Sequence, residues 1–137
     1  MSNNYVKEEI SKALEEYYLP YAKYVVSERA IPQLVDGLKP SQRASIWAMY
    51  KSGLLTGNRM KSANAVGRVM AYHPHGDASI YGALTRMAQS DSLLHPLIDG
   101  KGNMGMHTSR DIVPSSPRYT EMRLAEITKE LFRGIEK

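Results

Sequence analysis

Tyr119 is the strongest candidate for a chemically reactive residue in this sequence. It follows Arg118 in the stretch SSPRYTEMRL at residues 115–124. Pro114 and Pro117 favour an extended backbone just before it. A tyrosine in such a place either packs against the protein or serves as a nucleophile. Most tyrosines pack, so the stretch alone favours the structural interpretation, and the rest of the chain must decide.

Histidines provide the other candidates for chemistry. His73 and His75 place two imidazoles in one extended segment, but no third ligand follows at a zinc spacing, so no metal site is predicted. A capping or phosphate-contacting role suits them better. His95 and His107 lie in predicted loops, and no Ser-His-Asp catalytic triad can be assigned with either of them. The run GKGN at 100–103 lacks the spacing and the Lys-Ser/Thr end of a P-loop.

Three helices are expected in the middle of the chain. The first begins at Pro40, after the turn residues VDGLK, and runs through Gly53. The second begins with Ser62 as its N-cap and ends at the stretch HPHG. The third is capped by Asp77 and runs to about Ser90, with apolar residues at helical spacing.

The last two of these helices, joined by a tight turn, match a helix-turn-helix. The outward face of the second one carries short polar residues and one arginine: Ser79, Gly82, Arg86 and Gln89. Such a face allows close approach to a DNA groove, although a solvated face gives the same pattern. Beyond it, DGKGN at 99–103 predicts a turn or hairpin that could be a wing, and a last helix is expected over residues 120–134.

The N-terminal stretch is expected to be an amphipathic helix over residues 5–19. Pro20 should kink or restart it before it continues to Pro32. Five of the nine tyrosines lie before residue 25, so this arm needs a surface to cover. Packing on its own domain and packing on a partner are equally compatible with the spacing.

Length and composition indicate one soluble globular domain. The chain has 137 residues, 42% of them hydrophobic, and no cysteine, which fits an intracellular protein. Its net charge of +4 permits an anionic partner such as nucleic acid. The first residues lack the apolar core of a signal peptide, and no apolar run approaches the roughly 20 residues that span a bilayer.

Five ordered blocks of the sequence resemble one protein family. They are RAIPQLVDGLKPSQR at 29–43, KSANAVGRVMAYHPHGD at 61–77, MAQ at 87–89, DGKGN at 99–103 and RYTEMRL at 118–124. Together they are similar to the N-terminal part of the breakage-reunion subunit of bacterial type IIA DNA topoisomerases, the A subunit of DNA gyrase or topoisomerase IV. The two enzymes are not separable on these residues.

The resemblance implies a fold and a domain organisation. Residues 29–137 are expected to form a winged-helix DNA-gate domain, mainly α with a small β wing, and residues 1–28 a helical arm that reaches toward a partner subunit. It also implies a fragment, because such subunits continue through a tower, a coiled-coil dimer gate and a DNA-wrapping tail.

The resemblance assigns roles to individual residues. Tyr119 would be the nucleophile that attacks a DNA phosphate and stays linked to the 5′ end of the cleaved strand, so that another duplex can pass. Arg118, Arg29 and His75 would stabilise the charge that develops on the phosphate. DNA contacts would come from the helix face above, through Ser79 and Arg86, and from three further positions: Lys39, Arg43 and His73.

Cofactors and partners follow from the same resemblance. Double-stranded DNA is the substrate, the full-length chain is a homodimer, and the enzyme is an ATP-hydrolysing isomerase of the cytoplasm. Mg²⁺ and ATP would be bound by a B-type partner subunit, which has an acidic metal site and an ATPase domain. No metal ligand and no membrane contact are expected here, and the fragment alone is expected to be inactive.

The sequence departs from the family pattern at several positions. Ala44 follows Arg43 where a second basic residue is common, and the stretch HTSRDIVPSSP at 107–117 differs from the usual acidic, glycine-containing loop. Ala78 and Gly82 occupy the positions where a serine and an acidic residue commonly anchor the water shell of quinolone-bound magnesium. The competing hypothesis is a non-enzymatic winged-helix DNA-binding protein. A histidine-metal hydrolase is disfavoured by the ligand count.

Overall fold

The computed structural model of the protein describes residues 9–135, which divide into two units between Pro40 and Ser41. The division predicted between residues 28 and 29 stays a prediction.

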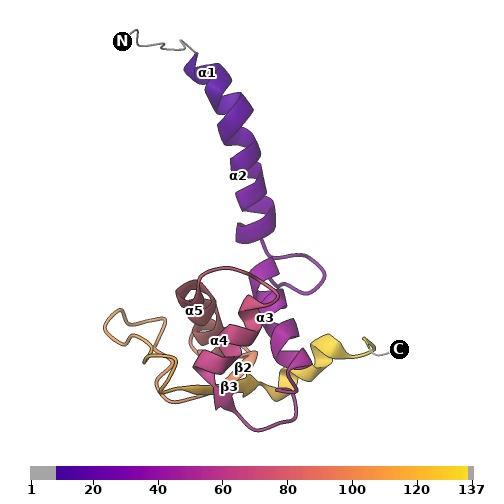
Figure 1. Ribbon diagram of the computed structural model, residues 1–137, viewed down its shortest axis with the longest axis vertical. Coiled ribbons are helices and arrows are strands. Elements are labelled where there is room, and N and C mark those ends of the chain that lie inside the picture. The colour runs from indigo at the N-terminus through magenta and orange to yellow at the C-terminus, as the bar shows by residue number, and fades with distance from the viewer. Residues whose placement is uncertain (1–8, 136–137) are drawn as a thin grey trace. The chain divides into compact units, whose positions relative to one another are not determined.

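The first unit is built on one helical run (Figure 1). It passes through α1 (Ile10–Ala13), the π-helical stretch η1 (Leu14–Tyr18), α2 (Leu19–Val25) and a second π-helical stretch η2 (Val26–Ala30). The amide of Leu19 donates to the carbonyl of Leu14, five residues back, and Pro20 then stands in the first turn of α2. The helical run therefore passes Pro20 by changing from π-helix to α-helix at Leu19 and does not restart, because proline has no amide hydrogen and is tolerated in a first turn. Val6 and the rest of the predicted helix before Glu9 lie outside the described residues.

The described part of the second unit, with Pro40 before it, contains three α-helices and one 3₁₀ helix. They are α3 (Pro40–Lys51), which begins at the unit boundary, α4 (Ser62–Met70), α5 (Asp77–Ala88) and η3 (Glu126–Phe132). The three α-helices agree with the predicted ones to within two residues. Phe132 at the end of η3 stacks on Tyr50 of α3, with ring centroids 4.1 Å apart.

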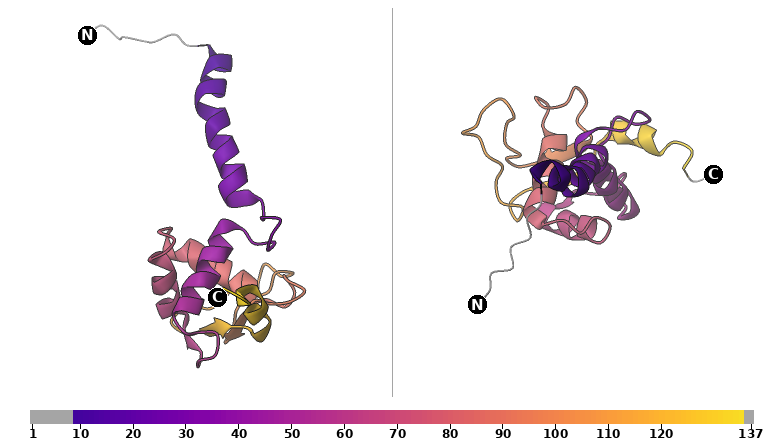
Figure 2. Two further views of the ribbon diagram at one scale, coloured as in Figure 1. Left: turned by 90° about the vertical axis from the view of Figure 1, so that its right-hand side faces the viewer. Right: turned by 90° about the horizontal axis from the view of Figure 1, so that it is seen from above.

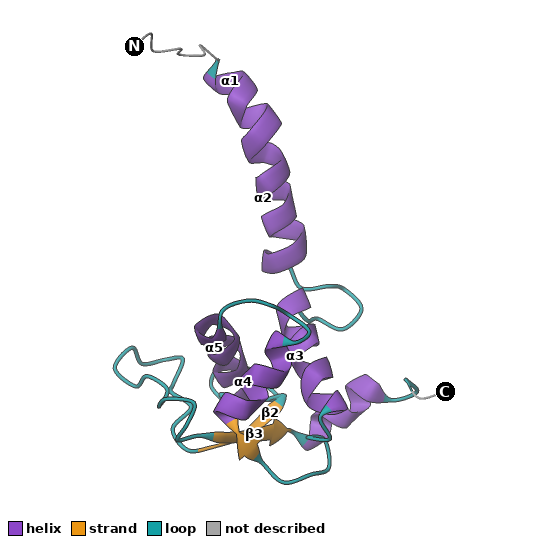
Figure 3. Ribbon diagram, in the orientation of Figure 1, coloured by secondary structure: helices purple, strands orange, loops and turns teal. Residues whose placement is uncertain are grey.

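A small antiparallel sheet accompanies these helices (Figure 3). Its strands are β1 (Met60–Lys61), β2 (Ile98–Lys101) and β3 (Glu121–Leu124), in the order β1-β3-β2. Met60 and Gly100 lie opposite Met122 on either side of β3. The loop between β2 and β3 projects beyond the helices (Figure 2). The turn or hairpin predicted at residues 99–103 is wrong for its first three residues, because Asp99, Gly100 and Lys101 belong to β2 and pair with β3.

The core lies where α3, α4, α5 and the sheet meet. Its most deeply buried large side chains are Met49, Val69, Leu84, Met87, Ile98, Met122 and Leu124. The predicted α+β class, mainly helical with a small β wing and a helix-turn-helix in α4 and α5, is confirmed.

The predicted helix over residues 120–134 is wrong in its first half. Met122 and Leu124 are buried while Glu121 and Arg123 are half-exposed, which is the period of a strand. This segment pairs with β1 and β2, and the tertiary hydrogen bonds override the helical pattern that its apolar residues also fit.

Two predicted helix caps are also wrong. Ser62 is the first residue of α4 and its buried hydroxyl makes no capping hydrogen bond. The N-cap position of α5 is Gly76, and the Asp77 carboxylate instead accepts a hydrogen bond from the next amide, that of Ala78, at 2.8 Å. That bond still satisfies one amide of the first turn.

Gln89 does not belong to the outward face predicted for α5. Only 8% of it is exposed, and its side-chain nitrogen donates to the carbonyl of Met104 at 2.8 Å. The helix ends at Ala88 and Gln89 is extended, so the helical period no longer applies. Among the helices of residues 9–135, none is both long enough and apolar enough to cross a membrane.

Candidate functional site

Tyr119 lies in the turn that leads into β3, and 70% of its surface is exposed. Its amide donates to the carbonyl of Ser116 at 2.9 Å, which closes the turn. The packing interpretation is therefore wrong for this tyrosine, since its phenol faces solvent rather than the core. A phenol in this position is accessible to a macromolecular substrate.

Arg118 lies beside this phenol. The central carbon of its guanidinium is 5.9 Å from the centre of the Tyr119 ring, within the range of a cation–π contact. Arg118 is itself exposed. The permanent charge of the guanidinium is thus held next to the phenol and remains available to an anion.

The backbone around Tyr119 is tied to the start of α4. The first amides of a helix have no partner within the helix, and α4 has no capping side chain. The amide of Ser62 donates to the carbonyl of Thr120 at 3.0 Å, and that of Ala63 donates to the carbonyl of Pro117 at 3.2 Å. These two carbonyls flank Tyr119, so the first two amides of α4 are hydrogen-bonded to the turn that carries it.

Three buried hydroxyls meet beneath the same turn. Thr120 donates to the Oγ of Ser62 at 2.7 Å, and its Oγ1 lies 2.9 Å from the phenolic oxygen of Tyr81. Tyr81 also donates to the carbonyl of Ser115 at 2.6 Å. Sequence reasoning missed this cluster, because a hydroxyl 58 residues away from its partner leaves no local signal.

His73 and His75 lie between α4 and α5, and their rings are stacked. The ring centres are 3.8 Å apart with an interplanar angle of 3°. His75 is exposed and His73 is half-buried. In the part of the chain that the structure describes, no group of three or more His, Asp or Glu side chains could hold a metal ion.

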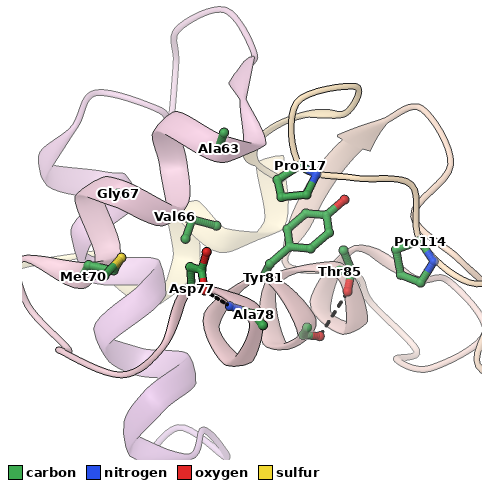
Figure 4. Close-up of a pocket in the computed structure, with 11 residues that line it drawn as sticks. Ala63, Val66, Gly67, Met70, Asp77, Ala78, Tyr81, Thr85, Pro114 and Pro117 are labelled. Atoms are coloured by element: carbon green, nitrogen blue, oxygen red, sulfur yellow. Dashed lines mark hydrogen bonds between the residues drawn. The ribbon is translucent and has the colours of Figure 1, made fainter.

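An open pocket of about 540 Å³ separates α4 from α5 (Figure 4). Ala78 and Gly82 line it together with Pro117, the residue before Arg118. In Figure 4, the hydroxyl end of Tyr81 points toward Pro117 across the pocket. The predicted drug-site positions therefore share a cavity with the turn that carries Tyr119.

The outer face of α5 carries Ser79 and Arg86, both exposed as predicted. Arg86 lines a second pocket, of about 340 Å³, with Arg110 of the loop between β2 and β3. That loop is held by the carboxylate of Asp91, which accepts hydrogen bonds from the amide and the hydroxyl of Thr108 at 3.0 and 3.2 Å. The backbone bond from Thr108 holds the pKa of Asp91 below its ordinary value.

The remaining predicted residues are spread over both units. Arg29 is exposed in η2 and Lys39 is half-buried just before α3, and both belong to the first unit. Arg43 is half-buried in α3. The second unit thus brings together Arg118 and Tyr119, and separately the two histidines.

The blocks that form this site match one protein family. The family model that describes the A subunit of DNA gyrase/topoisomerase IV covers residues 29–137. The chain belongs to this family. It is 46% identical over 134 residues to the DNA gyrase A subunit of Thermotoga maritima, and 44% identical over 131 residues to that of Mycobacterium tuberculosis.

These alignments cover 96% and 94% of the chain, but only 16% and 15% of the two gyrase A subunits. The region shared with the gyrase A subunits includes the whole turn with Arg118 and Tyr119, the α4–α5 pair and the sheet.

Asp99 stabilises the sheet in this gyrase A region. Its carboxylate accepts hydrogen bonds from Nη2 of Arg59 at 2.7 and 2.8 Å, and from Nε of Arg123 at 2.8 Å. Partial burial alone would raise the pKa of Asp99, but the two arginines hold it below its ordinary value of 3.8. Arg123 belongs to β3, so this ion pair fixes the strand that follows Tyr119.

Proposed function

We propose that this chain carries the DNA cleavage and religation site of a type II DNA topoisomerase, with Tyr119 as the nucleophile. The observation that carries the proposal is an exposed tyrosine beside an exposed arginine, on a turn tied to α4, in a chain of the gyrase A family. An exposed phenol has no packing role to explain its position.

The proposed reaction exchanges one phosphodiester for another. The phenolic oxygen of Tyr119 attacks a phosphorus of the DNA backbone, the bond from phosphorus to the 3′ oxygen breaks, and the 5′ phosphate remains on the tyrosine. The phenol loses a proton and the departing 3′ oxygen gains one, so no net proton or water is consumed. Religation is the reverse step and requires no further energy source.

Arg118 supplies the charge that this reaction needs. An ordinary phenol has a pKa of about 10, so it is largely protonated near neutral pH and must be assisted. A guanidinium beside the ring favours the developing phenolate and the charge that builds on the phosphate oxygens. Arg29 and His75 are proposed to contact the same phosphate in the assembled enzyme.

DNA binding is proposed on the outer face of α5 and the loop beside it. Ser79 and Arg86 are exposed there, and Arg110 lines the same pocket as Arg86. Phosphate contacts of this kind position a duplex without reading its sequence. Lys39, Arg43 and His73 are proposed to extend the contact, and the net charge of +4 favours it.

Metal and nucleotide are proposed to belong to a second subunit. This proposal is supported by the described residues 9–135, which hold no group of three His, Asp or Glu side chains placed to bind a metal ion. The proposed assembly is a homodimer of the complete subunit, with a B-type partner that binds Mg²⁺ and ATP, acting on double-stranded DNA in the cytoplasm.

One experiment separates this proposal from a winged-helix protein that only binds DNA. A complete A subunit with this chain as its N-terminal part is assembled with the B subunit, Mg²⁺ and supercoiled DNA. Tyr119→Phe should abolish strand cleavage while DNA affinity changes less than about threefold, because the hydroxyl is one contact among many. Absence of cleavage by the unmodified enzyme would favour the binding protein, and cleavage at the wild-type rate in the variant would show that another residue is the nucleophile.

A further inference from the structure

We infer that the hydroxyls of Ser62, Tyr81 and Thr120 form a positioning cluster for Tyr119. The inference rests on the proposed function, because it assigns these residues to the placement of the nucleophile. None of the three touches the reacting atoms, and each acts through the turn that carries Tyr119.

Thr120 is the link between the cluster and the nucleophile. Thr120 and Tyr119 share one planar peptide unit, so anchoring Thr120 restrains the backbone of Tyr119. Thr120 is completely buried, whereas its neighbour Tyr119 is 70% exposed. Fixing the side chain of Thr120 below the surface therefore fixes the direction in which the phenol of Tyr119 points into solvent.

The cluster joins three separate parts of the fold. Ser62 begins α4, Tyr81 lies in the second turn of α5, and Thr120 leads into β3. The contacts of 2.7 and 2.9 Å that connect them lie beneath the turn. Movement of either helix relative to the sheet would stretch these bonds and shift Tyr119.

Proton counting shows that the cluster has little freedom. Thr120 donates its one proton to Ser62, and Tyr81 donates its one proton to the carbonyl of Ser115, which is 2.6 Å away. The 2.9 Å contact between Thr120 and Tyr81 is therefore a hydrogen bond only where one of these two protons is shared. Tyr81 therefore holds both ends of the segment 115–120, one on each side of Tyr119.

A purely apolar core would not require these hydroxyls. Phenylalanine at 81 and valine at 120 would fill nearly the same space, and buried hydroxyls carry a desolvation cost that their hydrogen bonds only offset. What the hydrogen bonds add is direction, since they permit one arrangement of the turn. Displacing a reacting group by about 1 Å can slow a reaction by roughly a hundredfold.

The test uses the complete A subunit with its B subunit, Mg²⁺ and a labelled duplex. Tyr81→Phe and Thr120→Val each remove a hydroxyl at nearly constant volume. Thr120→Ser keeps a hydroxyl at position 120. The matched control is Thr128→Val, which removes a fully buried hydroxyl that donates to the carbonyl of Leu97 at 2.6 Å, beyond the far end of β3. Single-turnover cleavage rate, DNA affinity and Tm are measured for each variant.

We expect Tyr81→Phe and Thr120→Val to cleave roughly ten- to a hundredfold more slowly, with DNA affinity within about threefold of wild type. Thr120→Ser should recover to within about threefold of the wild-type rate. Thr128→Val should lower Tm as much as the others do and leave the rate unchanged, because a structural loss alone does not displace Tyr119.

The inference is overturned if Tyr81→Phe cleaves at the wild-type rate, or if Thr128→Val slows cleavage as much as the cluster variants do. Should Thr120→Val fail to fold, Tyr81→Phe still decides. Tyr119→Phe is run in parallel. If it still cleaves, the proposed function fails; if it is inactive while Tyr81→Phe is fully active, only the positioning role fails.

Discussion

The hydroxyl of Thr120 lies 2.7 Å from that of Ser62, although the two residues are 58 positions apart in the sequence. Their backbones are joined as well, since the amide of Ser62 donates to the carbonyl of Thr120 at 3.0 Å. Thr120 follows Tyr119 directly, so the start of α4 is bonded to the turn that presents the phenol. The exposed side chain of Tyr119 is thus carried by a backbone turn that is hydrogen-bonded to a helix. A nucleophile has to be held in position by contacts of this kind.

Arg118→Ala should slow DNA cleavage by roughly a hundred- to a thousandfold, the usual effect of removing a group that stabilises transition-state charge. DNA affinity should change little. Two quantities are measured in the complete enzyme: the single-turnover cleavage rate, and the DNA affinity by titration. Arg133→Ala is the control, because Arg133 is exposed directly after η3 and pairs with Glu130. Weaker binding at an unchanged cleavage rate would reduce Arg118 to a DNA contact.

Duplex DNA should bind to the isolated chain weakly and with a strong dependence on salt. The logarithm of the binding constant should fall linearly with the logarithm of salt concentration, since phosphate contacts release counterions. Arg86→Ala and Arg110→Ala should each reduce the slope by about one. Lys129→Ala is the control, because Lys129 pairs with Glu126 at 2.8 Å.

Binding of the isolated chain that does not respond to salt would contradict the account of phosphate contacts. The chain alone should also fail to relax supercoiled DNA. Relaxation without a partner subunit would refute the assignment of metal and ATP to that partner.

Quinolones should stabilise the cleaved complex of an enzyme built on this chain only at raised concentration. Neither Ala78 nor Gly82 has a side chain that accepts a hydrogen bond from a metal-bound water. Ala78→Ser with Gly82→Glu should restore sensitivity. A side chain can start at position 82 without a clash, because a Cβ there meets no atom within 4 Å outside its own helix backbone and chain neighbours. An equal response of the unmodified and the doubly substituted enzyme would show that the drug binds through other contacts.

Asp99 should make the stability of the protein depend on pH. Its folded-state pKa is lowered, so its contribution is present above about pH 4, the range of an unperturbed Asp, and is lost as the pH falls through the folded-state pKa. Asp99→Asn should lower the free energy of unfolding by about 1 to 2 kcal/mol at pH 7. Urea unfolding at pH 7 and pH 3 measures the difference, with the exposed Asp111→Asn as control. A deficit of the same size at both pH values would contradict the account.

Local sequence signals predicted the helices well. Pro40 and the turn before it marked the start of α3, and the apolar spacing from Ile80 to Met87 predicted α5. These signals lie within one or two turns of the residues that they describe. The block RYTEMRL likewise predicted roles for Tyr119 and Arg118, because the resemblance depends on residue types and order rather than on packing; these roles stay a prediction.

Local sequence signals did not predict the strand pairing and the hydrogen bonds between residues that are distant in the sequence. Met122 and Leu124 fit both a helix and a strand, and only their hydrogen bonds to β1 and β2 decide for the strand. Ser62 resembled an N-cap, yet its hydroxyl bonds to Thr120 in the core. The cluster that holds the turn of Tyr119 was missed for the same reason.

The most direct test of the central claim is to identify the residue that becomes linked to DNA. The complete enzyme is incubated with Mg²⁺ and a duplex, denatured during cleavage, and digested with protease and nuclease before mass spectrometry. We predict a peptide that contains Tyr119 and carries a nucleotide joined through its 5′ phosphate. A nucleotide on any other residue, or joined through its 3′ phosphate, would contradict the account.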